Sequence, residues 1–268
     1  MARLFDDASD QYLYNGTQVT GMPFTMACWF NSNDITINQS LMTMSSEDDS
    51  GWHGLWLSLA GAQVGDYIQA AAYAGAGVKL AKTSTGYSAD TWHHACGIFA
   101  SATDRRAYID GGSKGTNTDS CTPLSINNTV IGTTYYFTGA INESEAPFSG
   151  AIAGAAIWNV ALTDAEVASL ATGVSPRSVR PESLVFYAPL WRDEDEDFVG
   201  GLSLTPVNTP TVAAHPRVLY LALPQIGKTA AGGAGSIGEI TTVPWANVGQ
   251  FAGVAEASIS QIAGVIAN

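Results

Sequence analysis

Short apolar runs, several alternating with polar residues, repeat along the first 224 positions and are separated by turn residues. This pattern is typical of β-strands, because successive side chains of a strand point to opposite faces of a sheet. The 28 glycines and 11 prolines among 268 residues favour many turns over long helices. We therefore predict an all-β fold of antiparallel sheets packed as a sandwich. The predicted strands are 24–30, 54–59, 67–73, 93–99, 106–109, 129–131, 150–158, 183–190 and 218–223.

One short helix is predicted after the strand at 150–158. Thr163 is a good N-cap, and Glu166 three residues later completes a capping box. Gly173 ends the apolar spacing and Pro176 follows it, as is usual beyond the C-terminus of a helix. The apolar face of this helix consists of Val167, Leu170 and Ala171.

The composition changes after residue 224. Residues 225–239 are rich in Gly, Ala and Ser, which predicts a flexible linker behind a domain at 1–224. Two similar eleven-residue units follow, 247–257 and 258–268, and two units are too few for a solenoid. Their apolar positions need another surface, so we predict a docking or oligomerisation tail at 240–268. The predicted assembly residues are Trp245, Val248, Phe251, Val254, Ile259, Ile262 and Val265.

The charge of the chain limits the classes of molecule that it is expected to bind. The net charge is −13 and the lysines and arginines are scattered, which argues against nucleic-acid binding. Only 13% of the residues are charged, so uncharged polar residues or partner chains must cover much of the surface. The N-terminal segment has no apolar signal-peptide core, and the chain has no apolar run of about 18 residues. We therefore expect neither a secretory signal nor a membrane span.

Several segments resemble, in order, the motifs of the laminin-G-like and pentraxin-like group of concanavalin A-type jelly rolls. In that group a W-x-H strand leads to a y-i-D-G hairpin, then to an f-x-G-x-i strand and a short capping helix. The resemblance implies two antiparallel sheets packed face to face over roughly residues 5–190. The matching segments are Phe24–Phe30, Thr91–Cys96, Tyr108–Gly111, Phe148–Asn159 and Ala161–Val167.

The residues of these motifs suit that fold. Trp92 and His94 should share one face of their strand, where a large aromatic is useful between two sheets. His93 should point to the opposite face, so the two histidines cannot share a metal ion. Asp110 and Gly111 supply the positive φ angles of a tight hairpin.

The resemblance also bears on the three cysteines. Cys28 and Cys96 fall where pentraxins place a strand-to-strand pair, which implies neighbouring strands with both side chains on the same side. Their Cα atoms would then lie roughly 4–7 Å apart. Because no secretory signal is expected, we expect two adjacent thiols. Cys121 has no evident partner and is expected to act as a small apolar residue.

Acidic residues offer calcium as a candidate cofactor, although no motif requires one. Pentraxin-type sites draw on acidic residues before the f-x-G strand, which here implies Glu143 and Glu145, approached by Asp48 and Asp49. The acidic run at 193–197 lacks the glycine and glutamate of an EF-hand loop, so we expect it to be a solvated turn.

Aromatic residues beside loops form a candidate glycan surface, because sugar rings stack on exposed aromatic rings. Trp56 and Phe137 are more simply interpreted as core residues. The remaining candidates for glycan binding are Trp52, His53, Tyr135 and Tyr136.

Catalysis is not expected. Retaining glycosidases on this fold carry an E-x-D-x-x-E or E-x-D-x-E strand, whose alternate carboxylates act as nucleophile and acid. Here Glu47 opens such a motif, but Gly51 and Trp52 occupy the positions of its last carboxylate.

Three functions remain, and the leading one is a phage virion structural protein. The C-terminal tail looks like the tails of proteins encoded in tailed-phage structural modules. The chain would then be a capsid decoration protein or a tail-fibre or baseplate component, made in the host cytoplasm and located in the virion. Its partners would be other virion proteins, copies of itself and surface glycans. The alternative is a carbohydrate-binding module of a bacterial surface protein, and a glycoside hydrolase is the least favoured.

Overall fold

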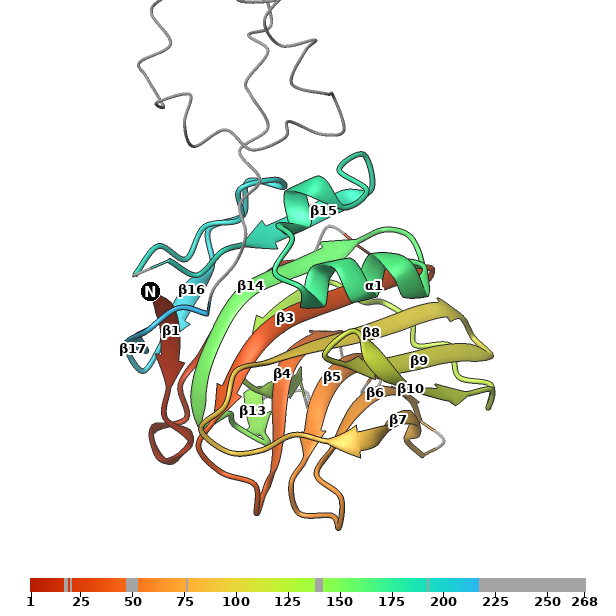
Figure 1. Ribbon diagram of the computed structural model, residues 1–268, viewed down its shortest axis with the longest axis horizontal. Helices are drawn as coiled ribbons and strands as arrows, with labels where there is room; N and C mark the ends of the chain where they lie inside the picture. Colours follow the sequence, from red (N-terminus) through yellow and green to blue (C-terminus); the bar gives the residue numbers. More distant parts are fainter. Residues whose placement is uncertain are drawn as a thin grey trace, which may run out of the picture. The chain divides into compact units, whose positions relative to one another are not determined.

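Two antiparallel sheets form the architecture (Figure 1). The computed structural model describes residues 1–216 except 17, 18, 20, 47–52, 76, 138–141 and 192, and describes only the backbone of 135–137 and 142–144. The eight-stranded sheet runs in the order β10 (Gly112–Asn117), β9 (Asp104–Ile109), β8 (His93–Ser101), β3 (Phe24–Ser32), β14 (Gly150–Trp158), β1 (Ala2–Phe5) and β17 (Thr211–Ala213), with β15 (Leu184–Ala188) also pairing with β14.

The second sheet has seven strands. Its order is β16 (Thr205–Val207), β2 (Tyr12–Gly16), β11 (Asn128–Ile131), β4 (Asn38–Ser45), β5 (His53–Ala60), β6 (Tyr67–Ala74) and β7 (Lys79–Gly86). A separate hairpin joins β12 (Thr134–Phe137) to β13 (Asn142–Glu145). Short 3₁₀ turns lie at Asp7–Ser9 and Pro176–Ser178. The predicted all-β sandwich is confirmed.

The main core lies between the two sheets. Strand β3 contributes Phe24, Met26 and Phe30, which alternate with residues on its other face. Strand β5 contributes Leu55, Leu57 and Leu59 in the same alternating manner. Burial of each such side chain stabilises the fold by about 1.5–3 kcal/mol. The period of two read from the sequence therefore identifies the inward faces.

Helix α1 (Asp164–Ala171) covers part of the outer face of the eight-stranded sheet, in front of β3 and β8 in Figure 1. The predicted capping box is confirmed, with Thr163 as N-cap and Glu166 bonding back to it. The predicted hairpin turn is also confirmed, with φ of 50° at Asp110 and 75° at Gly111. A Cβ on Gly111 would lie 2.8 Å from the Cα of Ala168 in α1, so glycine lets the helix approach the turn.

The predicted arrangement of the cysteines is confirmed for their strands and wrong for their faces. Cys28 and Cys96 do lie on neighbouring strands, β3 and β8. The register pairs Cys28 with Ala95 and Ala27 with Cys96, so the two thiols point to opposite faces of the sheet. Cys28 packs between the sheets, whereas Cys96 packs beneath α1. The prediction that they share a side is wrong, because the true register is shifted by one residue.

The predicted opposite faces of His93 and His94 are confirmed, and so is the shared face of Trp92 and His94. The prediction that this shared face lies between the two sheets is wrong. His93 lies beside Phe30 on the core side, and His94 lies beside Trp29 on the outer side. Trp92 packs in the same outer cluster as Trp29. It therefore lies outside the sandwich, because the inward positions of β8 belong to small residues and Phe99.

The C-terminal predictions fall outside the described residues. They comprise the strand at 218–223, the linker at 225–239 and the tail at 240–268 with its apolar residues, and all remain predictions. None of the helices in the described part of the chain has the length and apolar character that a membrane crossing requires.

Candidate functional site

The outer face of the seven-stranded sheet carries an indole beside uncharged polar groups. Because Leu55, Leu57 and Leu59 point into the core, Trp56 and Ser58 of β5 point outward. The register places Gln69 of β6 directly beside Ser58. We call Trp56, Ser58 and Gln69 the Trp56 patch.

Three buried polar atoms on this face have no hydrogen-bond partner in the described part of the chain. They are Ser58 Oγ, Gln69 Nε2 and Ser45 Oγ. Ser45 lies two residues beyond Thr43 on β4, and Thr43 pairs with Trp56. A buried polar group without a partner costs roughly 1–3 kcal/mol. A polar occupant that reaches these atoms would recover part of that cost.

The β12–β13 hairpin is fixed to the same outer face. The hydroxyl of Thr43 donates to the carbonyl oxygen of Thr133 (2.9 Å), and the hydroxyls of Ser40 and Thr134 are hydrogen-bonded. The Thr133 hydroxyl also donates to the carbonyl oxygen of Glu145 on β13 (3.0 Å). The hairpin therefore forms a wall beside the Trp56 patch.

Tyrosines extend the face on both sides. Tyr14 of β2 lies in line with Trp56 through Val130 and Thr43, and its ring centroid is 6.1 Å from that of Tyr12. Tyr73 of β6 pairs with Gly54, which has the outward orientation of Trp56. The outer face thus combines aromatic rings with neutral hydrogen-bonding groups.

The predicted glycan residues are only partly brought together. His53 begins β5 with the orientation of Leu55, so it does not share the outward face of Trp56. Tyr135 and Tyr136 lie in β12, opposite Ser144 and Glu143, and only their backbone is described. Trp52 lies outside the described residues. The glycan role of these four residues stays a prediction.

Sequence reasoning missed the Trp56 patch. Trp56 was expected in the core, and it is only 9% exposed, but it packs on the outer face. The alternation of Leu55, Leu57 and Leu59 with Trp56 and Ser58 was the signal that could have found it.

The predicted calcium ligands remain untested. Asp48 and Asp49 lie outside the described residues, and only the backbone of Glu143 is described. Glu145 is exposed at the end of β13, opposite Thr134. Among the described side chains, no group of three or more His, Cys, Asp or Glu could hold a metal ion.

The prediction that the acidic run at 193–197 is a solvated turn is wrong for two of its five residues. Asp193, Glu194 and Glu196 are exposed, whereas Asp195 and Asp197 turn inward. The difference arises because both inward carboxylates accept hydrogen bonds, Asp195 from Arg3 and Asp197 from backbone amides.

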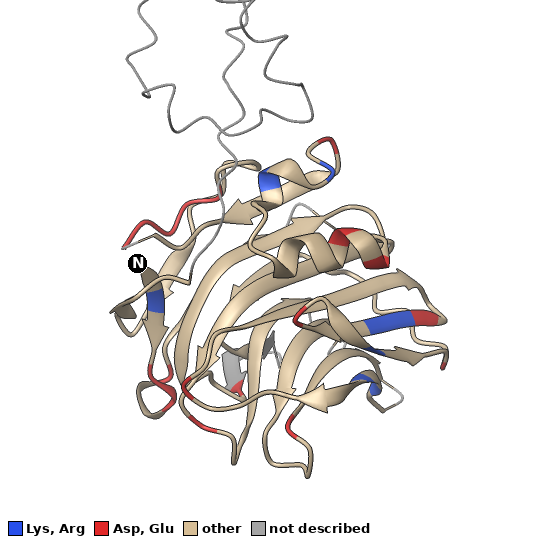
Figure 2. Cartoon of the chain, in the orientation of Figure 1, with Lys and Arg blue, Asp and Glu red and all other residues tan. Residues whose placement is uncertain are grey.

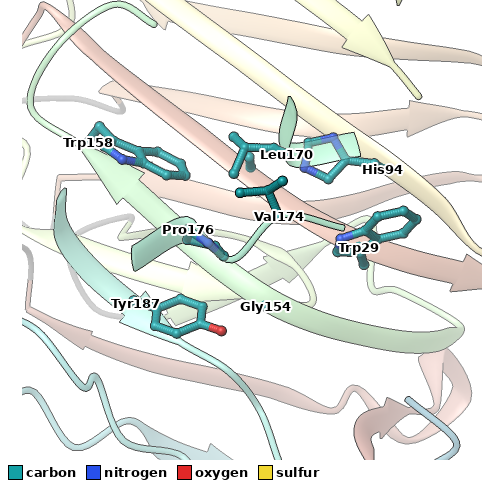
Figure 3. A pocket seen from close by; sticks show the side chains of 9 residues that line it. Trp29, His94, Gly154, Trp158, Leu170, Val174, Pro176 and Tyr187 are labelled. Atoms are coloured by element: carbon teal, nitrogen blue, oxygen red, sulfur yellow. The ribbon is translucent and has the colours of Figure 1, made fainter. Parts of the chain in front are cut away.

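A small pocket lies on the opposite, helix-covered side of the sandwich (Figure 3). Trp29 and His94 line one side, and Trp158 and Tyr187 line the other, with Val174 between them. Burial lowers the pKa of His94 to about 4, so its ring is neutral at pH 7. About 10 Å³ is open to the centre of a water-sized group, which is room for one water and not for a sugar.

Comparisons with known proteins agree with this architecture. Residues 6–168 match the model of the concanavalin A-like lectin/glucanases superfamily. No curated protein sequence matches the chain.

Several solved structures of low sequence identity are similar to the chain. A candidate carbohydrate-binding protein from Bacteroides ovatus is 17% identical with a TM-score of 0.50, over 79% of this chain and 61% of that protein. A heptameric pentraxin from Limulus polyphemus is 15% identical (TM-score 0.46, 62% of this chain, 83% of that one). The sialidase module CBM40 from Ruminococcus gnavus, bound to α2,3-sialyllactose, is 12% identical (TM-score 0.46, 57% and 84%). Because the family model spans more than half of its length, the chain belongs to the concanavalin A-like lectin/glucanases superfamily.

Proposed function

We propose that this domain is a non-catalytic carbohydrate-binding module whose ligand lies on the outer face of the seven-stranded sheet. The observation that carries the proposal is the position of Trp56 beside the unpartnered Ser58 Oγ and Gln69 Nε2. The C–H face of a sugar packs on an indole, and its hydroxyl groups bond to neutral polar side chains. Both kinds of group occupy neighbouring positions of two paired strands, and all three residues are nearly buried, with exposures of 9% for Trp56, 5% for Ser58 and 8% for Gln69.

The absence of a carboxylate motif in the sequence supports binding without turnover. Retaining hydrolysis needs two carboxyl groups roughly 5–5.5 Å apart. After Glu47 and Asp49, the sequence continues with Gly51 and Trp52, so the strand motif of the glucanases is incomplete. The proposal therefore assigns the module to recognition.

The test is a glycan array followed by titration calorimetry with the best oligosaccharide. Ser58→Ala and Gln69→Ala should each weaken binding roughly two- to tenfold, the value of one lost hydrogen bond. Thr116→Ala, an exposed change on edge strand β10 of the other sheet, is the matched control. Unchanged affinity in both site variants would show that the ligand does not use this face.

A virion assembly role is the second candidate, supported by the composition of the tail. Trp245, Phe251 and Ile262 are among its apolar residues, and each stabilises by roughly 1.5–3 kcal/mol when buried. A copy of the same chain or another virion protein would supply the surface. Deletion of 240–268 should leave a folded monomer that no longer enters oligomers or particles. Normal assembly of the truncated chain would refute this role.

A further inference from the structure

We propose a second sugar-binding site, formed by the acidic loop at the opposite edge of the molecule, where β1 pairs with β17. The inference extends the proposed function and rests on it only for the class of ligand. Its residues belong to the loop after β15 and to the two chain segments beside it. None of them belongs to the Trp56 patch. Figure 2 shows the acidic run in red beside the N-terminal strand.

A hollow of sugar size lies at this edge. It is lined by Met1, Trp191, Glu194 and His215, and about 430 Å³ is open to water-sized groups, against about 10 Å³ in the pocket beside His94. Ligand pockets of proteins typically measure roughly 300–1,000 Å³. The hollow can therefore admit a monosaccharide unit, which the pocket beside His94 cannot.

The loop is held in place by its inward carboxylates. Asp195 accepts a hydrogen bond from Arg3 Nη2 (2.6 Å), and both side chains are nearly buried. Asp197 accepts from the backbone amides of Tyr187 (2.8 Å) and Val199 (2.9 Å). Asp195 turns inward, whereas Glu194, which precedes it, is exposed. These contacts fix the part of the loop that follows Glu194, which lowers the entropy lost there when a ligand binds.

The chemistry of the lining suits a neutral sugar. Trp191 supplies an indole, whose ring centroid lies 6.4 Å from that of Phe198, itself 45% exposed. Glu194 offers a carboxylate that accepts hydrogen bonds from hydroxyl groups. His215 Nδ1 donates to the carbonyl oxygen of Pro216 (2.8 Å), which leaves Nε2 as an acceptor. That Nε2 atom is buried, so the Glu194 carboxylate is the acceptor that faces solvent in this hollow.

Titration calorimetry with the array-selected oligosaccharide tests the second site. We expect two sugars per chain for the wild type and one for Trp191→Ala, since loss of an aromatic stacking surface weakens binding roughly tenfold or more. Glu194→Gln keeps the shape of the side chain and should weaken the same site several-fold. Val199→Ala alters an exposed residue of the same loop that does not line the hollow, and it should retain two sites.

The outcomes separate the two proposals. If Trp191→Ala and Glu194→Gln leave stoichiometry and affinity unchanged, the second site is refuted and the Trp56 patch stands. If only these two variants lose binding, while Ser58→Ala and Gln69→Ala do not, the patch is refuted and the loop site stands. If the wild type binds no sugar at millimolar concentration, both are refuted. A thermal melt of each variant confirms that loss of binding does not reflect loss of the fold.

Discussion

The buried ion pair between Arg3 and Asp195 should add little to the free energy of unfolding compared with an apolar pair in its place. Removal of only one partner should be strongly destabilising. The Arg3 side chain is 5% exposed and that of Asp195 is 9% exposed, and their closest atoms are 2.6 Å apart. Burial raises the pKa of Asp195 although Arg3 lowers it, so the cost of desolvation exceeds the attraction. Removing both charges should therefore cost far less than removing one.

Asp195→Ala leaves the Arg3 guanidinium buried without its counter-ion. Removal of one partner of such a pair typically costs about 3–5 kcal/mol. For a domain of this size that corresponds to a drop in melting temperature of roughly 6–20 °C. The double variant Arg3→Met with Asp195→Leu should come within about 1–2 kcal/mol of the wild type, because apolar replacements of buried pairs are often neutral.

Urea unfolding followed by tryptophan fluorescence at pH 7 provides the free energies of the wild type, Arg3→Met, Asp195→Leu and the double variant, which together close a double-mutant cycle. The same measurement is made on Asp195→Ala. The exposed pair Arg106–Asp104 is a built-in comparison, with side chains 26% and 38% exposed. Asp104→Ala should cost less than about 1 kcal/mol, as is usual for surface pairs. The reasoning is refuted if Asp195→Ala is as mild as Asp104→Ala, or if the double variant loses the sum of the two single losses.

Three further predictions concern the helix side of the sandwich. Gly111→Ala should destabilise the fold by roughly 1–3 kcal/mol, because φ at this position is 75° and the added Cβ would clash with α1. Gly112→Ala meets open space and should cost little. Equal costs of the two variants in a thermal melt would contradict this. Thr163→Ala should lower the free energy of unfolding in urea by about 1 kcal/mol, because the capping box is lost. Thr163→Ser should restore it. A neutral effect of Thr163→Ala would show that packing alone holds α1. His94 is neutral when folded, so the unfolded state binds more protons between pH 6.5 and about 4, and about 3 kcal/mol of stability should disappear as pH falls through that window. His94→Leu should flatten that part of the pH profile, and a profile identical to that of the wild type would rule His94 out as its source.

Local signals in the sequence were sufficient for the sandwich and its helix. Strand alternation identified the inward residues, such as Leu57, because its period depends only on the backbone. The Thr163 cap and the Asp110–Gly111 turn were equally local, since each acts within a few residues. These features needed no knowledge of what packs against them.

The remaining features depend on residues far apart in the chain. The register of β3 against β8, which separates Cys28 from Cys96, follows from the packing of whole sheets. The burial of Asp195 depends on Arg3, which lies 192 positions away. The outward position of Trp56 was missed because a large aromatic residue fits a core equally well. Its place on a face walled by the β12–β13 hairpin appears only in three dimensions.

The central claim is that a sugar binds the outer face of the seven-stranded sheet, and chemical-shift mapping tests it most directly. The labelled protein is titrated with the array-selected oligosaccharide, and ¹H–¹⁵N spectra report the indole N–H of Trp56 and the side-chain amide of Gln69. The account predicts saturable shifts at these two groups and along β4–β6. It is contradicted if saturating sugar leaves both groups unmoved.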